Sequence, residues 1–217
     1  MMGKTHYYII HIALKRHFHK CSSRADLRYD ELMFAALRMD YLKTKWAIWF
    51  KSLDADKDNK ITPEDMQISA KKFEEIRKLI GDKGSVDGAE FDNTKWWNDY
   101  IFRKGPGVSM TKDEFVESLA EAYQKDKAAF RQEMERCFGD IAKFVTENMD
   151  RPIQEQEFAF GFKVFGQEDA GQVAKAFQLF TAAYGQPTVQ QIVDAWVQFI
   201  TDDDQSKQDM IKEAFGN

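Results

Sequence analysis

Residues 54–65 read Asp-Ala-Asp-Lys-Asp-Asn-Lys-Ile-Thr-Pro-Glu-Asp, so that acids alternate with other residues and the alternation then stops. A hard divalent cation prefers oxygen ligands, and a loop of about 12 residues supplies them from positions 1, 3, 5, 7, 9 and 12. The candidate ligands at these positions are Asp54, Asp56, Asp58, the backbone carbonyl of Lys60, Thr62 through a water molecule, and Asp65. The spacing predicts a calcium site at which magnesium competes.

Two positions of this loop depart from the usual pattern. Position 6 requires a positive φ and is normally glycine, and Asn59 is the best substitute for it. Position 12 is normally glutamate, and Asp65 is shorter by one methylene group, which gives a tighter cage and favours magnesium relative to calcium. A solvated acidic turn is the alternative interpretation, but the matching positions and the flanking sequence favour a metal site.

The flanks of the loop carry the signals of two helices. Large apolar residues recur at helical spacing before the loop, namely Trp46, Trp49, Phe50 and Leu53. After the loop, Thr62-Pro63 supplies a capping hydroxyl and a proline at the first helical position. An apolar stripe follows over residues 66–80, and Gly81 ends it. Residues 40–80 are therefore predicted to form a helix–loop–helix unit of the EF-hand type.

Such units occur in pairs, and further frames of the same length follow at residues 103–114 and 180–191. The first of these has Arg103, Gly105 and Gly107 at positions 1, 3 and 5, so that only Glu114 could ligate and no metal is expected. The frame at 180–191 has Gly185 at the glycine position but contains no acid. At position 8 of the first two loops, Ile61 is predicted to form a short bridge with a residue near Met110.

A third frame lies at residues 146–157. Its ligand positions hold Thr146, Asn148, Asp150 and Glu157. Arg151 occupies the glycine position and Pro152 follows it. The missing first aspartate and the neighbouring cation weigh against metal binding, with weak binding as the alternative.

The chain is thus predicted to be all-α, with four EF-hand units in two pairs and three degenerate loops. The predicted segments are a basic N-terminal extension (1–39), a first pair (40–123) connected internally by residues 81–88, and a second pair with a short C-terminal helix (129–217). Asp202-Asp203-Asp204 does not fit a further loop. We expect it to mark a helix boundary, with Ser206 or a neighbour capping the last helix.

With these loops and this length, the chain resembles the sarcoplasmic calcium-binding proteins of invertebrates and the related luciferin (coelenterazine)-binding proteins. The similarity covers residues 40–217 and is carried by Asp65 at position 12, the aromatic first helix, the wide spacing of the first two loops, and a final Ala214-Phe215-Gly216. The resemblance implies a compact four-hand globule in the cytosol that has lost one or more sites. A single convincing site is fewer than such proteins usually keep.

The net charge of −5 is unevenly distributed. Residues 1–28 carry six basic groups and one acid, so the remainder is near −10, which argues against nucleic acid as a partner and suits cations. No apolar run is long enough to span a bilayer. We expect a cytoplasmic monomer with free thiols at Cys21 and Cys137. A mitochondrial location, with residues 1–28 as a transit segment, is the alternative.

Calcium buffering through the first loop is the predicted function. One alternative is a calcium-controlled carrier of a hydrophobic small molecule, for which aromatic stripes would line a cavity, although such stripes usually form the core. Another is a partner-binding sensor, which usually needs paired sites. An enzyme is not expected, because all four histidines lie in the N-terminal extension and no glycine-rich phosphate loop or nucleophile motif occurs.

Overall fold

The computed structural model describes residues 24–80, 92–146, 148–164, 167 and 169–216. Contacts between residues divide the chain into two compact units, Met1–Asp40 and Tyr41–Asn217. Several predictions lie wholly or mostly outside the described residues, namely the histidine-rich segment, the thiol of Cys21, the alternative transit segment and the connection at 81–88.

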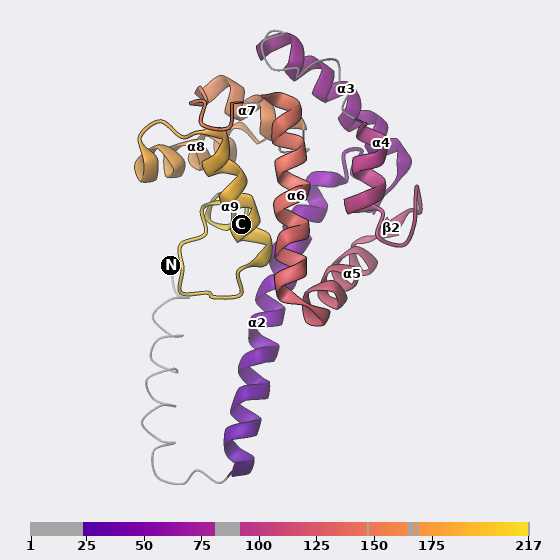
Figure 1. Cartoon of the computed structure of the whole chain (residues 1–217), viewed down its shortest axis with the longest axis vertical. Coiled ribbons are helices and arrows are strands. Elements are labelled where there is room, and N and C mark those ends of the chain that lie inside the picture. Colours follow the sequence, from indigo (N-terminus) through magenta and orange to yellow (C-terminus); the bar gives the residue numbers. More distant parts are fainter. Residues whose placement is uncertain (1–23, 81–91, 147, 165–166, 168, 217) are drawn as a thin grey trace. The chain divides into compact units, whose positions relative to one another are not determined.

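Helices make up most of the described chain, in agreement with the predicted all-α class (Figure 1). The elements are, in order, α2 (Arg24–Leu53), β1 (Lys60–Ile61), α3 (Pro63–Ile80), α4 (Asn93–Trp96), the π-helical turn η2 (Trp97–Ile101), β2 (Met110–Thr111), α5 (Lys112–Lys125), α6 (Lys127–Val145), α7 (Glu155–Val164), α8 (Ala170–Tyr184), α9 (Val189–Thr201) and α10 (Met210–Phe215). None of these described helices has the length and hydropathy that a bilayer span requires.

Helix α2 begins at Arg24, well inside the segment that the sequence assigns to the basic extension. Residues 24–39 contain no proline or glycine and are rich in alanine, leucine, arginine and methionine, which have high helix propensity. The apolar residues before the first loop therefore mark the buried part of α2 and do not mark the residue at which the helix begins. Among the described side chains of α2, burial begins at Tyr41 and includes Leu42, Trp46 and Trp49.

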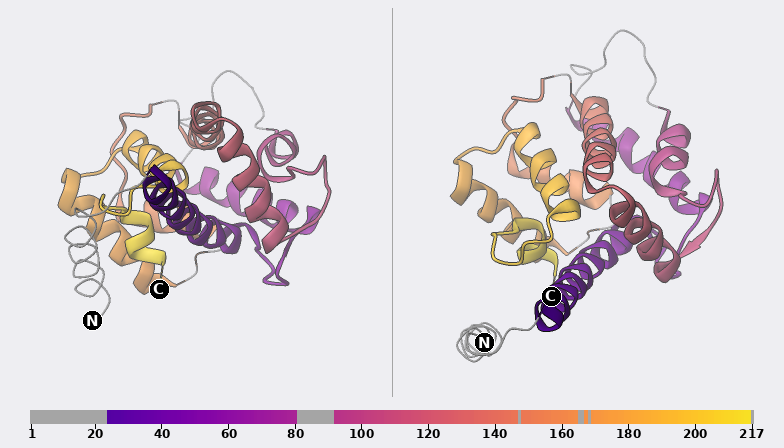
Figure 2. Two further views of the ribbon diagram at one scale, coloured as in Figure 1. Left: turned by 90° about the horizontal axis from the view of Figure 1, so that it is seen from below. Right: turned by 60° about the horizontal axis from the view of Figure 1, so that its bottom comes forward.

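Helix pairs and aromatic side chains build the core of the unit Tyr41–Asn217. Helix α6 packs against α9, α3 against α7, and α8 against both α7 and α10 (Figure 1 and Figure 2). Trp46 meets Tyr123 and Phe130 edge to face, and Phe138 stacks on Trp196. Burial of one such side chain contributes roughly 1.5–3 kcal/mol. The aromatic stripe of the first helix is core packing.

Cys137 lies on the buried face of α6 and is a free thiol, as predicted. Its backbone carbonyl accepts a hydrogen bond of 2.9 Å from the ring Nε1 of Trp96. Burial raises the pKa of the Cys137 thiol well above its usual value.

Two loop pairs connect the helices with the same register. In the first, β1 and β2 are antiparallel with Lys60 opposite Thr111 and Ile61 opposite Met110, which confirms the predicted bridge. In the second, an isolated antiparallel bridge joins Pro152 to Thr188. In both cases position 7 of one predicted loop faces position 9 of its partner. The frames read from the sequence at 146–157 and 180–191 therefore share the spatial relation of the first two.

Two details of the helices did not follow from the sequence. Helix α4 changes after Trp96 into the π turn η2, which adds a residue to the helical repeat. The last helix is capped by Asp209, whose side chain accepts the N–H of Lys212. Ser206 instead donates its hydroxyl to Asp204, so it caps nothing.

Candidate metal centre

The first loop is held between the end of α2 and the start of α3. The N–H of Asp54 still bonds the carbonyl of Phe50 at 3.0 Å, so the helix continues into position 1 of the loop. Helix α3 begins at Pro63, as predicted. The two helices thus fix both ends of the loop while the intervening acids remain in the turn.

Three predicted ligands come together in this loop. One carboxylate oxygen each from Asp54, Asp56 and Asp58 lies within 4.8 Å of the others. Asp54 is 6% exposed, whereas the other two are exposed to solvent. Like charges at this separation repel each other, and a cation between them removes that cost.

Backbone N–H groups hold the three acids in place. Asp54 Oδ1 and Oδ2 accept bonds from the N–H groups of Asp58 (3.1 Å) and Asn59 (3.0 Å). Asp58 Oδ1 accepts the N–H of Lys60 at 2.8 Å. These bonds wind the chain around the point where the carboxylates meet, which is the arrangement that cation ligation by a short loop requires.

Two residues of the loop have a left-handed backbone. Asn59 has φ 69°, which confirms the prediction for position 6, and Lys57 has φ 64°. Asparagine tolerates this conformation better than most residues, but lysine does not. Sequence reasoning missed Lys57 because nothing in its side chain marks the position.

Asp65 is fully buried and is bonded to the backbone at both ends of the loop. Its Oδ1 accepts the N–H groups of Ala55 (2.7 Å) and Asp56 (3.2 Å), and its Oδ2 accepts the N–H (2.8 Å) and hydroxyl (3.1 Å) of Thr62. The side chain therefore joins the beginning of the loop to its end. A direct bond from Asp65 to a cation stays a prediction.

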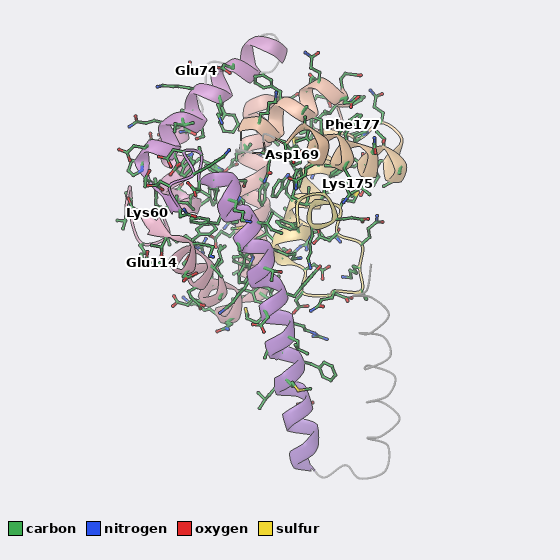
Figure 3. All side chains as sticks on the ribbon, turned by 180° about the vertical axis from the view of Figure 1, so that it is seen from behind. Lys60, Glu74, Glu114, Asp169, Lys175 and Phe177 are labelled. Carbon is green, nitrogen blue, oxygen red and sulfur yellow. The ribbon has the colours of Figure 1, made fainter. Side chains whose placement is uncertain are left out.

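Lys60 and Thr62 occupy the places that the sequence assigns to them. Lys60 lies in β1 opposite Thr111 of β2, and its side chain is exposed (Figure 3). The side chain of Thr62 is half-buried and points to Asp65. Their coordination through a carbonyl and a water molecule remains a prediction.

Burial sets the electrostatics of the two hidden carboxylates. Desolvation raises the pKa of both Asp54 and Asp65 above the ordinary value of 3.8, and backbone hydrogen bonds partly oppose the shift. A divalent cation favours the ionised form of a neighbouring carboxylate. The donor set is oxygen only, so the residues fit calcium or magnesium and not a soft metal.

The second loop carries its own cations. Arg103 at position 1 forms an ion pair with Glu133 of α6, and Lys104 pairs with Glu114. Glu114 also completes a capping box with Thr111 at the start of α5. The only acid at a ligand position is therefore already bonded within the loop.

In the third and fourth loops, polar side chains are also bonded within the loop itself. Arg151 pairs with Glu157 in the third loop. In the fourth, Thr188 and Gln191 form a capping box at the start of α9. Thr146, at position 1 of the third loop, is buried and accepts the N–H of Asn148.

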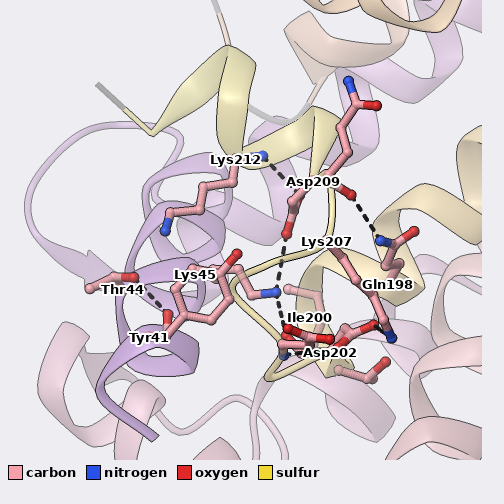
Figure 4. A network of polar contacts seen from close by, with 12 residues as sticks. Tyr41, Thr44, Lys45, Gln198, Ile200, Asp202, Lys207, Asp209 and Lys212 are labelled. Carbon is pink, nitrogen blue, oxygen red and sulfur yellow. Dashed lines mark hydrogen bonds and ion pairs between the residues drawn. The ribbon is translucent and has the colours of Figure 1, made fainter. Parts of the chain in front are cut away.

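The acidic segment after α9 is neutralised by lysines. Lys207 pairs with Asp202, and Lys45 bonds both Asp209 (3.1 Å) and the carbonyl of Asp202 (2.7 Å) (Figure 4). Lys127 pairs with Asp203. The Lys45 side chain is only 1% exposed, and burial lowers its pKa. Sequence reasoning missed Lys45, which lies in an aromatic stripe far from its partners in the chain.

Comparison with known proteins gives one informative match. No family model matches the chain. A sarcoplasmic calcium-binding protein of Mizuhopecten yessoensis is 41% identical over 177 residues, which cover 81% of this chain and 98% of that protein.

Proposed function

The chain belongs to the sarcoplasmic calcium-binding protein family, and on that premise we propose that its first loop binds one calcium ion, with magnesium as a competitor. The proposed ligands are Asp54, Asp56, Asp58, the carbonyl of Lys60, a water molecule held by Thr62, and Asp65. Loops with a comparable number of charged ligands bind calcium at about 10⁻⁷–10⁻⁵ M. At that affinity the protein acts as a cytosolic calcium buffer.

The observation that carries this proposal is the convergence of three carboxylates on a left-handed turn. Asp54, Asp56 and Asp58 meet within 4.8 Å, and Asn59 has the positive φ that the loop needs at position 6. The relative named above is a calcium-binding protein by its description, which agrees with this chemistry.

The other loops support the limit of one site. In the second, Lys104 already bonds the only acid at a ligand position, and the fourth contains no acid. We propose four EF-hand units in two pairs, supported by the identical register of the two loop bridges. One functional loop among four suits storage better than a switch that depends on paired sites.

Asp54→Ala tests the proposal. Position 1 is the buried anchor of the site, so this variant should lose calcium binding in isothermal titration, whereas the wild type binds one equivalent. Asp113→Ala, which removes an exposed aspartate from the second loop, serves as the matched control and should bind normally. Two or more strong sites in the wild type, or retained binding in Asp54→Ala, would refute the assignment.

The alternative roles predict different outcomes. A carrier would be isolated with a small hydrophobic molecule, which native mass spectrometry detects as added mass. A sensor would expose apolar surface when calcium binds. No catalytic activity is expected.

A further inference from the structure

The third loop contains an internal ion pair at the position where a metal-binding loop has its last ligand. Arg151 Nη1 lies 3.0 Å from both Oε1 and Oε2 of Glu157. The same Nη1 also donates to the carbonyl of Pro152 at 3.4 Å. Glu157 accepts in addition the N–H of Gln154 at 3.1 Å. One guanidinium nitrogen thus engages both oxygens of the carboxylate that would otherwise face a cation.

This ion pair is largely removed from water. The side chains of Arg151 and Glu157 are 26% and 23% exposed. Arg151 Nε and Nη2 are buried and have no hydrogen-bond partner among the described residues. The Glu157 carboxylate is therefore the main group that compensates the arginine charge, and the arginine is in turn what compensates the carboxylate.

The backbone of the same loop is already paired with the fourth loop. The carbonyl of Arg151 accepts the N–H of Val189 at 3.2 Å, and the carbonyl of Met149 accepts the N–H of Gln190 at 2.8 Å. Ile153 donates its N–H to Pro187 at 2.8 Å. The third and fourth loops are thus paired through their backbones while the guanidinium of Arg151 is bonded to Glu157, the acid at position 12 of the third loop.

We infer that Arg151 is a built-in cation that takes the place of a divalent metal in the third loop, keeping the second loop pair closed at any calcium concentration and excluding metal from a latent site. The charge is fixed in the chain, so the pair does not depend on ion binding. The latent ligands are oxygen atoms of Thr146, Asn148, Asp150 and Glu157.

A comparison with the second loop separates the two parts of this inference. There Lys104 pairs with one oxygen of Glu114, and this ion pair is exposed. Positions 1, 3 and 5 of that loop are Arg103, Gly105 and Gly107, none of which has a side-chain oxygen. Removal of Lys104 should therefore release a carboxylate without creating a site. Removal of Arg151 releases a carboxylate beside three further oxygen-bearing side chains.

The experiment uses Asp54→Ala as background, so that the first loop is silent. Calcium titration by calorimetry compares Asp54→Ala alone with the same chain carrying Arg151→Gly, which removes the cation and supplies the residue favoured at position 6. The double variant should gain one weak event at about 10⁻⁴–10⁻³ M, the range of sites with few charged ligands. Arg151→Lys, which keeps the charge, and Lys104→Met, which is the matched control, should gain none.

The outcomes distinguish this inference from the proposed function. Calcium binding by Asp54→Ala alone contradicts the assignment of the first loop. A folded Asp54→Ala/Arg151→Gly chain that binds no calcium overturns the inference about Arg151.

Metal-free unfolding in urea provides a second readout should the glycine variant fail to fold. Arg151→Met in the otherwise unchanged chain should lower the midpoint, because it leaves the Glu157 charge largely buried without its partner, whereas Arg151→Lys stays close to the wild type. An unchanged midpoint in Arg151→Met also overturns the inference.

Discussion

At the scale of single residues, Asp65 links the beginning of the first loop to its end. Its carboxylate accepts four hydrogen bonds that tie Ala55 and Asp56 to Thr62. Besides burial, the charge of the same carboxylate contributes to the raised pKa of Asp54. Asp65 thus joins the two ends of the loop and adds to the negative charge that a cation would compensate.

Asp65→Glu should increase the preference for calcium over magnesium. The extra methylene group lets the carboxylate reach the ion with both oxygens, and calcium accepts the higher coordination number whereas magnesium does not. We expect a change of roughly tenfold in the ratio of the two affinities, about 1.4 kcal/mol, measured by calcium titration with and without magnesium. An unchanged ratio would show that Asp65 does not coordinate.

The metal-free chain should respond to pH through Asp54. Because burial raises the pKa of Asp54 above 3.8, the folded chain takes up a proton at a higher pH than the unfolded chain does. The cost of the ionised group is therefore fully present above the raised pKa and disappears as the pH falls to 3.8. Relative to Asp54→Asn, the metal-free wild type should gain stability over this window in urea unfolding. A constant difference between the two would contradict the shift.

Residue chemistry could be predicted from sequence where a single side chain decides the geometry. Asn59 was predicted to have a positive φ because it is the best substitute for glycine there, and it does. Lys57 shares that conformation without any sequence signal. The partners of Lys45 could not be predicted, because a lysine in an aromatic stripe does not reveal which distant acid will face it.

At the scale of elements, capping residues and loop bridges determine where helices begin and how loops pair. Helix α5 begins with a capping box in which Thr111 and Glu114 each bond the backbone of the other. Thr111 also faces Lys60 across the β1–β2 bridge. One residue thus connects helix initiation to loop pairing.

Thr111→Ala should destabilise the chain by about 1 kcal/mol, the usual cost of removing a hydroxyl cap. Glu114 would keep its bond to the N–H of residue 111, so the helix should shorten and not unfold. The midpoint of urea unfolding measures the loss, and Thr111→Ser, which retains the hydroxyl, should recover most of it. Equal midpoints for wild type and alanine variant would show that the cap contributes nothing.

Periodicity predicted the helices and loop pairs better than it predicted helix ends. The bridge between Ile61 and Met110 follows from apolar spacing and loop length, which local sequence encodes. Trp97, at the start of the π turn, bonds Ser69 of α3, and the cap residue Asp209 bonds Lys45 of α2. Tertiary contacts of this kind leave no regular pattern in the chain.

At the scale of the whole molecule, the first two loops of the unit Tyr41–Asn217 differ in how a cation can act on them. The first loop has acids that repel each other, whereas the second, its partner across β1–β2, contains the Lys104–Glu114 ion pair. Opening of a sensor pair requires both loops to change. Calcium binding should therefore stabilise the first pair without spreading its helices.

Calcium should raise the melting temperature while the fluorescence of a hydrophobic dye stays flat or falls. At a hundredfold excess over Kd, binding adds about 2.7 kcal/mol, which corresponds to roughly 5–11 °C for a domain of this size. Calorimetry and dye titration on the same samples measure both effects, and Asp54→Ala, which should show neither, is the control. A strong calcium-dependent rise in dye fluorescence would favour a sensor.

The reactivity of the buried Cys137 thiol can report how often the core opens. Its thiol is fully buried on α6 and only the thiolate reacts with alkylating reagents, so modification has to wait for the surrounding helices to separate. The rate of that reaction at residue 137 then reports how often the core opens, as hydrogen exchange does for amides. A cation that binds only the closed form slows this reaction by a factor of one plus the ratio of cation concentration to Kd, so ion binding at the first loop is measured as a longer half-life of a single thiol.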